Sequence, residues 1–253
     1  DVLFTEEKLI TKGLPQWYLM TLETEGLEKL LLIMKWKKQG RKQVTEEINM
    51  LEYENKLKEE GIYIVGGIDE AGRGPLAGPV VAACVVFDTR NPLPEARDSK
   101  KLTEKKREEL FDKIIESCLA YGIGVVDNDV IDEINILNAT YLAMQKAVLD
   151  LNEKNPEVVL VDHVHIPDMN IKQISITHGD ASSLCIAASS IIAKVTRDRI
   201  MRELDSLYPG YGFARHKGYG TKAHYEAIET LGISKVHRKT FLKKYITTSR
   251  SEE

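Results

Sequence analysis

The spacing of apolar residues changes near Gly61. From about residue 15 to residue 60, apolar positions such as Leu27 and Leu30 recur at three- and four-residue intervals with charged residues between them. This periodicity predicts helices, and Gly40 is expected to separate two of them. We therefore expect residues 1–60 to form a helical amino-terminal extension.

After Gly61 the pattern becomes rich in β-branched residues and ends, for the first apolar run, at Asp69 and Glu70. After this run the sequence predicts four more strands and four helices, and strands interleaved with helices favour an α/β architecture of layers. The first three strands are expected to form a meander. Predicted strands lie at about 62–68, 79–87, 121–126, 158–162 and 171–176, and predicted helices at about 103–119, 133–151, 183–207 and from 222 onward.

The size and composition favour one main domain. A chain of 253 residues with 43% hydrophobic content buries one substantial core and a small appendage. We place this domain at residues 61–245 and expect residues 246–253 to form a polar tail. No apolar run is long enough to cross a bilayer, so a soluble monomer without membrane contact is expected.

The cysteines indicate a reducing compartment. Cys84, Cys118 and Cys185 are odd in number, widely spaced and set among apolar residues, which favours neither a disulfide framework nor a thiolate metal site. We therefore expect a cytoplasmic protein.

Four acidic residues stand where a charge is costly to bury. Asp69 and Glu70 follow one apolar run, Asp162 closes another, and Asp180 precedes the long predicted helix. Each alone has an ordinary explanation as a turn former or a helix cap. Together they favour a bound cation, because converging carboxylates repel one another unless a metal ion reverses the cost.

The donor chemistry indicates which metal. Carboxylate oxygens with no paired histidine or cysteine favour Mg²⁺ or Mn²⁺ over zinc. Two such ions together assist an in-line displacement at phosphorus, so phosphodiester hydrolysis is the chemistry that these residues indicate.

Several motifs of the sequence resemble those of the ribonuclease HII family, the bacterial type 2 ribonucleases H. The resemblance covers roughly residues 61–241 and is carried by motifs in the family's order: Gly67-Ile68-Asp69-Glu70-Ala71-Gly72-Arg73-Gly74-Pro75, Asp98-Ser99-Lys100-Lys101-Leu102, Val161-Asp162, Gly179-Asp180, Ala193-Lys194-Val195-Thr196-Arg197 and His216-Lys217-Gly218-Tyr219-Gly220. The type 3 sister enzymes are similar too, but they lack the Gly-Arg-Gly loop.

The resemblance implies a ribonuclease H-like mixed β-sheet flanked by helices and assigns roles to residues. Asp69, Glu70, Asp162 and Asp180 match the family's four catalytic, metal-binding carboxylates. The segment 72–74 matches a loop whose backbone approaches the 2′-hydroxyl of the ribonucleotide, where glycine permits close approach. The residues expected to bind substrate are Gly72, Arg73, Gly74, Ser99, Lys100, Lys194 and Tyr219.

Charge is segregated along the chain. The formal net charge is -4, which by itself indicates no polyanionic partner. Between Lys194 and Lys244, however, twelve basic residues accompany only five acidic ones. We interpret this basic tract as a surface that follows a phosphate backbone. Solubilising helix faces are the alternative for part of it.

The function expected from the resemblance is hydrolysis on the 5′ side of a ribonucleotide in an RNA/DNA hybrid or in DNA that contains ribonucleotides, leaving a 3′-hydroxyl and a 5′-phosphate. Ribonucleotide excision and primer removal would be its uses. One alternative is a metal-dependent phosphatase or phosphotransferase acting on a small molecule, which would not need the basic tract. Another is a noncatalytic hybrid-binding module, which would not need four carboxylates.

Overall fold

A five-stranded mixed sheet forms the centre of the fold in the computed structural model, which describes residues 50–91 and 102–243. The sheet has the spatial order β3-β2-β1-β4-β5, with β1, β2 and β3 in an antiparallel meander and with β4 and β5 parallel to β1. The predicted meander and α/β class are confirmed. The strands are β1 (Ile64–Ala71), β2 (Val80–Asp88), β3 (Ala120–Val126), β4 (Val158–Asp162) and β5 (Lys172–Ile176).

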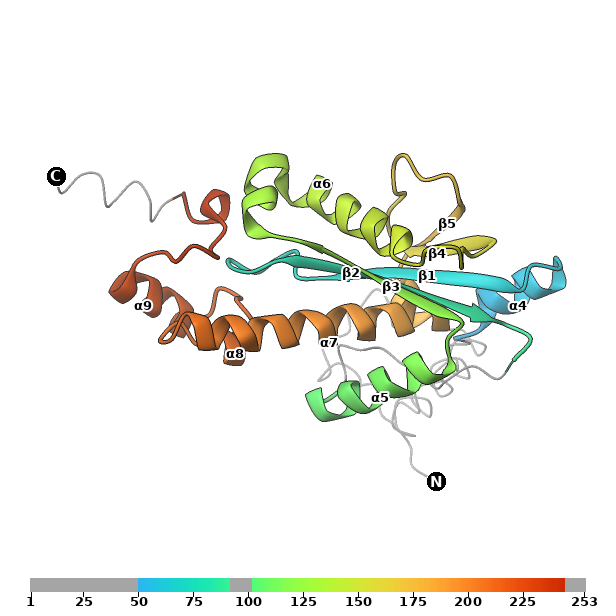
Figure 1. Cartoon of the computed structure of the whole chain (residues 1–253), viewed down its shortest axis with the longest axis horizontal. Coiled ribbons are helices and arrows are strands. Elements are labelled where there is room, and N and C mark those ends of the chain that lie inside the picture. Colours follow the sequence, from blue (N-terminus) through green and yellow to red (C-terminus); the bar gives the residue numbers. More distant parts are fainter. Residues whose placement is uncertain (1–49, 92–101, 244–253) are drawn as a thin grey trace, which may run out of the picture. The chain divides into compact units, whose positions relative to one another are not determined.

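Helices cover both faces of this sheet (Figure 1). α6 (Asn128–Leu149) packs on one face, and α7 (Leu184–Leu207) packs on the other with α5 (Glu104–Ser117) beside it. Because both faces are covered, β2 is apolar on both sides and has no polar alternation. The shorter elements are α4 (Glu52–Glu59), η2 (Gly179–Ala181), α8 (Phe213–His216), α9 (Lys222–Leu231) and η3 (Lys239–Phe241).

A glycine allows α7 to lie directly on β1. A Cβ atom at Gly67 would lie 2.1 Å from the carbonyl carbon of Cys185 in the first turn of α7. The hydroxyl of Ser189, one turn further on, donates to the carbonyl oxygen of Gly67 at 2.7 Å. This contact fixes the start of α7 relative to the end of β1, where the first two acidic residues lie.

The structure corrects two predicted boundaries. β1 continues through Asp69 and Glu70 to Ala71, three residues beyond the predicted end at about residue 68. α6 begins at Asn128, five residues before the predicted start, and Asn135, with a non-helical φ of 66°, divides it into two helical segments at a kink. The side chain of Asn135 accepts from the N–H groups of Leu137 and Asn138, as a helix cap does, so the predicted helix corresponds mainly to the second segment.

The short helix α4 packs onto the same compact unit as the sheet. Contacts divide the chain at residue 48, so α4 belongs to the unit that begins at Asn49. Leu57 is buried in the core beneath α7, and the buried carboxylate of Glu54 accepts from the hydroxyl of Ser183 and the N–H of Cys185. Residues 1–49 of the extension predicted at 1–60, and the polar tail predicted at 246–253, lie outside the described residues. Within the described parts, no helix combines the length and apolarity needed to cross a membrane.

Candidate active site

Strand register places Asp69 and Asp162 on the same face of the sheet. β1 and β4 are parallel, with Val65 opposite Val158 and Ile68 opposite Val161. Val65 and Val158 both belong to the core beneath α7, and side chains alternate along a strand, so Asp69 and Asp162 also point to the α7 side. The N–H of Gly179 donates to Oδ1 of Asp162 at 2.7 Å and fixes that carboxylate.

Asp180 lies in η2, immediately before α7, and its side chain is buried at 6% exposure. The alternative that Asp180 merely caps α7 is wrong. Ser183 is the N-cap, and its hydroxyl accepts from the N–H of Ile186 at 3.2 Å. Asp180 is therefore a buried acidic residue whose position the cap does not explain.

The acidic residues act on one another electrostatically. The pKa of Asp69 is raised well above its ordinary value, first by burial and then by the negative charges of Glu70, Asp162 and Asp180. The N–H of Glu70 donates to Oδ1 of Asp69 at 2.7 Å and opposes part of this shift. Four carboxyl groups from three separate segments thus lie within electrostatic reach of one another.

A cavity of about 430 Å³ opens beside these carboxylates. It brings together most of the predicted site residues with four that the sequence did not assign to the site: Ala71, Arg107, Ser190 and Arg197. Asp180 is not part of the lining, although its charge acts on Asp69. The lining comprises Asp69, Glu70, Ala71, Gly72, Arg73, Gly74, Arg107, Asp162, Ser190, Lys194, Arg197 and Tyr219.

The predicted ribonucleotide-recognition residues lie next to each other in this cavity. A Cβ atom at Gly74 would lie 3.7 Å from Cε1 of Tyr219, which is an ordinary contact distance. The Tyr219 side chain is exposed, and Arg73 reaches back so that its Nη1 lies 3.3 Å from Oε1 of Glu70. The loop, the tyrosine and the acidic residues therefore form one continuous surface.

Lys194 lines the cavity but is also engaged in an ion pair. Its Nζ lies 2.5 Å from Oδ1 of Asp198, and Arg107 approaches the other oxygen of that carboxylate at 3.8 Å. Burial lowers the pKa of Lys194, while Asp198 opposes the shift. The positive charge of Lys194 is thus already paired with the carboxylate of Asp198. Ser99 and Lys100 lie outside the described residues.

The interpretation of the basic tract as one phosphate-binding surface is wrong for several members. Arg197 and Arg238 are fully buried, and Arg199 and Arg202 pair with glutamates of α5. For the three arginines of α7 the physical reason is that this helix packs against the sheet on one side and against α5 on another. Their side chains therefore contact protein groups. Among the described residues of the tract, the exposed cations are Arg215, Lys222, Lys235, Lys239 and Lys243, and Lys222 also lies 3.7 Å from Glu226 on the same helix.

The carboxylates fit a hard divalent cation by donor chemistry. They supply only oxygen, and a cation would reverse the repulsion that raises the pKa of Asp69. Within residues 50–91 and 102–243, no three acidic, histidine or cysteine side chains form a ready-made metal cage. The other three carboxylates therefore lie close enough to act on Asp69 electrostatically, but the four side chains are not closed around a common point.

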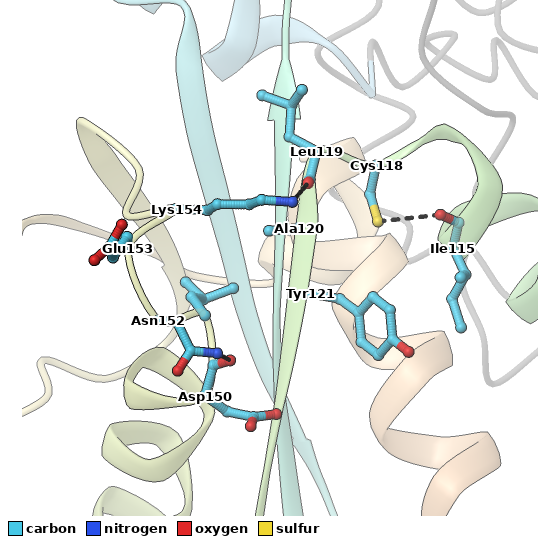
Figure 2. A pocket seen from close by; sticks show the side chains of 10 residues that line it. Ile115, Cys118, Leu119, Ala120, Tyr121, Asp150, Asn152, Glu153 and Lys154 are labelled. Atoms are coloured by element: carbon cyan, nitrogen blue, oxygen red, sulfur yellow. Dashed lines mark hydrogen bonds between the residues drawn. The ribbon is translucent and has the colours of Figure 1, made fainter.

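A larger cavity of about 740 Å³ lies elsewhere, along the edge strand β3 (Figure 2). Its side chains are of mixed type, and several of its polar groups form local hydrogen bonds, such as Lys154 Nζ to the Leu119 carbonyl at 3.4 Å. β2 separates β3 from β1 and its carboxylates. We therefore assign the chemistry to the smaller cavity.

Three histidines form a cluster beneath Tyr219, and two of them, His224 and His237, are fully buried. Nε2 of His224 lies 3.0 Å from Nε2 of His237, and Nδ1 of His224 lies 2.9 Å from the carbonyl oxygen of Tyr219. His216 stacks on His224 with ring centroids 4.4 Å apart. Burial, and next the charge of His224, lower the pKa of His237 to about 4.

This cluster predicts loss of stability in acid. Between pH 6.5 and pH 4, His237 binds a proton in the unfolded chain but not in the folded one. The free energy of unfolding therefore decreases as the pH falls, by up to about 1.4 kcal/mol per pH unit. Thermal unfolding of the parent and of His237→Gln from pH 7 to pH 4 measures this, with the exposed His165→Gln as control. Equal pH slopes for parent and His237→Gln would contradict the assignment.

Comparisons with known proteins converge on one family. The sequence profile of the Ribonuclease HII family matches residues 66–246. A ribonuclease HII of Clostridioides difficile (strain 630) is 58% identical over 191 residues, which cover 76% of this chain and 74% of the relative. A ribonuclease HII of Caldanaerobacter subterraneus subsp. tengcongensis is 56% identical over 194 residues, covering 77% and 80%.

Solved structures agree. Ribonuclease H2 of Pyrococcus horikoshii OT3 is similar with a TM-score of 0.57 and 31% identity, covering 70% of this chain and 93% of that one. RNase HII of Archaeoglobus fulgidus, solved in a complex with PCNA, has a TM-score of 0.57 and 27% identity, covering 69% and 93%.

The fold and the acidic cavity define the class of protein, a metal-dependent nuclease built on a mixed α/β sheet. The profile match and the level of identity then show the particular family: the chain belongs to the ribonuclease HII family. It is therefore a hydrolase of the ribonuclease H kind, a metal-dependent endoribonuclease that acts on nucleic acid.

Proposed function

We propose that this enzyme hydrolyses the phosphodiester on the 5′ side of a ribonucleotide, in RNA/DNA hybrids or in DNA with embedded ribonucleotides, and leaves a 3′-hydroxyl and a 5′-phosphate. One observation carries the proposal. A buried carboxylate, Asp69, interacts with three other acidic residues at the rim of a cavity that also contains a glycine loop and an exposed tyrosine.

Asp69, Glu70, Asp162 and Asp180 would hold Mg²⁺ or Mn²⁺, and we propose two ions. When bound, such ions activate the attacking water and stabilise the leaving oxygen. The protein's own contribution is to hold the carboxylates in place. The N–H of Glu70 orients Asp69, and the N–H of Gly179 orients Asp162, so neither carboxylate must be ordered when substrate arrives.

Recognition of the ribonucleotide belongs to the opposite side of the cavity. The loop of Gly72, Arg73 and Gly74 offers backbone groups that side chains do not shield, and the 2′-hydroxyl is the group that separates RNA from DNA at one site. The Tyr219 ring is exposed beside Gly74, where it can contact the sugar or base of the neighbouring nucleotide. Ser99, Lys100 and Lys194 remain proposed phosphate contacts.

The setting that we infer is a cytoplasmic monomer that acts in DNA replication and repair. The three cysteines are free thiols, and Cys84 and Cys185 are buried, which suits a reducing compartment. We also propose that residues 1–60 form an extension separate from the catalytic domain at 61–245, except that α4 packs on the latter.

The test is cleavage of a labelled DNA duplex with one embedded ribonucleotide, mapped at nucleotide resolution with Mg²⁺ or Mn²⁺. Cutting on the 5′ side of the ribonucleotide, loss of cutting on chelation and an intact all-DNA duplex are expected. Hydrolysis of a small phosphate monoester without duplex cleavage would favour the phosphatase alternative. Binding of the hybrid without cleavage by either ion would favour a noncatalytic module.

Gly74→Ala is expected to retain the fold and lose selectivity. The added methyl group has room, because its only neighbour within 4 Å is Cε1 of Tyr219 at 3.7 Å, but it projects into the proposed sugar site. We expect the ratio of kcat/KM for the ribonucleotide duplex to that for the all-DNA duplex to fall by roughly tenfold, with an unchanged Tm. Kinetics equal to those of the parent would count against the role of the loop.

A further inference from the structure

Two buried arginines lie directly beneath the glycine loop. Arg238, just before η3, is 0% exposed, and Arg197, on α7, is 1% exposed. Neither forms a salt bridge with an acidic side chain of the described residues. Burying an unpaired guanidinium is costly, so something else in the fold must compensate these two charges.

The compensation comes from backbone carbonyl oxygens of residues 72–79, which begin with the glycine loop, and from that of Lys217. Arg238 uses Nε, Nη1 and Nη2 to donate five hydrogen bonds at 2.6 to 3.0 Å, which is the full donor capacity of a guanidinium. Arg197 donates three more at 3.0 to 3.2 Å, and one of these reaches the segment that carries Tyr219. The acceptors are the carbonyls of Gly72, Arg73, Pro75 and Gly78 for Arg238, and of Ala77, Pro79 and Lys217 for Arg197.

These bonds set the direction of the loop's N–H groups. The peptide bonds of the loop are trans, so the C=O and the N–H of one peptide point in opposite directions. The carbonyls of Gly72 and Arg73 point inward to Arg238, so the N–H groups of Arg73 and Gly74 point outward, on the side that lines the cavity. Neither N–H forms a hydrogen bond within residues 50–91 and 102–243.

Gly72 completes the arrangement. It adopts a φ of +100°, and a Cβ atom there would lie 2.1 Å from Nε of Arg197. The loop therefore rests on the guanidinium without a side chain between them. Positive charge on the inner side and aligned peptide dipoles make the outer side a site for an oxygen acceptor.

We propose that Arg238 and Arg197 are positioning residues for ribonucleotide recognition. Arg238 holds the loop by the carbonyls of Gly72 and Arg73, Arg197 holds the segment that follows it at Ala77 and Pro79, and the two together aim the N–H groups of Arg73 and Gly74 at the oxygen of a substrate hydroxyl. The inference rests on the proposed function. It adds that specificity depends on two buried residues that do not touch the substrate. Arg238 is the stronger test because, of the two arginines, it is the one that donates to the loop carbonyls of Gly72 and Arg73.

The experiment compares Arg238→Lys with the parent and with the control Arg90→Lys. Lysine keeps the charge but presents three donors in place of the planar fork. Arg90 is an exposed arginine that pairs with Asp88 at the end of β2. At a temperature where each protein is folded by circular dichroism, we expect Arg238→Lys to lower kcat/KM on the embedded ribonucleotide roughly tenfold to a hundredfold. Binding of an all-DNA duplex should be unchanged, and the control should match the parent.

A folded Arg238→Lys protein with the parent's kcat/KM would overturn the inference. If Arg238→Lys does not fold, the amide resonances of Arg73 and Gly74 decide the matter in an Asp69→Asn protein, which does not turn over substrate. We expect a ribonucleotide-containing duplex to shift both resonances and an all-DNA duplex to leave them in place. Equal shifts with both duplexes would reject the proposal. A parent that cleaves no ribonucleotide duplex would instead reject the proposed function.

Discussion

Asp69→Asn is expected to lower cleavage of the ribonucleotide duplex by on the order of a thousandfold or more while the protein stays folded. Asp69 is the carboxylate on which the other three acidic residues act, so removing its charge weakens the hold on a cation most. The fold should tolerate asparagine, because its Oδ1 can still accept from the N–H of Glu70. The measurement is kcat at saturating Mg²⁺ or Mn²⁺.

Stability separates this effect from misfolding. Burial and three negative neighbours disfavour the charged form of Asp69 in the folded state, so the neutral variant should unfold at the same or a higher Tm near pH 7. Divalent ions should raise the Tm of the parent more than that of the variant. The exposed Asp112→Asn serves as control and should behave as the parent does. Full activity of Asp69→Asn would refute the site assignment.

Gly67→Ala is expected to cost about 3 kcal/mol of stability or more and to reduce activity in the protein that remains folded. The new methyl group would lie 2.1 Å from the backbone of Cys185, and backbone cannot rotate away as a side chain can. α7 must then move off β1, which displaces the residues of α7 that line the cavity from Asp69. Urea unfolding measures the loss.

Gly74→Ala is the matched control for this substitution, because the same methyl group there has open space. We expect the two variants to depart from the parent in different properties. Gly67→Ala should lose stability, whereas Gly74→Ala should keep the parent's stability and lose substrate selectivity. Equal unfolding midpoints for Gly67→Ala and the parent would show that α7 is not held as closely to β1 as the distance of 2.1 Å implies.

The sheet could be predicted because its pattern is local. β2 is a continuous apolar run, and such runs mark strands that are covered on both faces. The kink in α6 could not, since nothing in the alternation of apolar residues around Asn135 reveals a left-handed φ. Its two hydrogen bonds to Leu137 and Asn138 depend on a backbone conformation that pattern alone does not specify.

The acidic site was accessible from sequence for a related reason. Asp69 and Asp162 each follow an apolar run, and parallel strands bring such ends together. The roles of Arg197 and Arg238 were missed because counting charge treats every cation as exposed. A signal was present for Arg197, which shares a helical stripe with the buried Ala193 and Met201 at four-residue spacing. Arg238 lies outside any helix, and only the coordinates of the loop reveal its partners.

The parallel alignment of β1 with β4 also decides whether the carboxylates can come together during folding. A slip of one residue between these strands would turn Asp162 toward α6 and away from Asp69, because side chains alternate along a strand. Chains aligned wrongly, or not yet finished as far as Asp180, would lack a working centre. Under the proposed assignment of the four carboxylates, correct alignment of β1 with β4 is therefore a condition for catalysis.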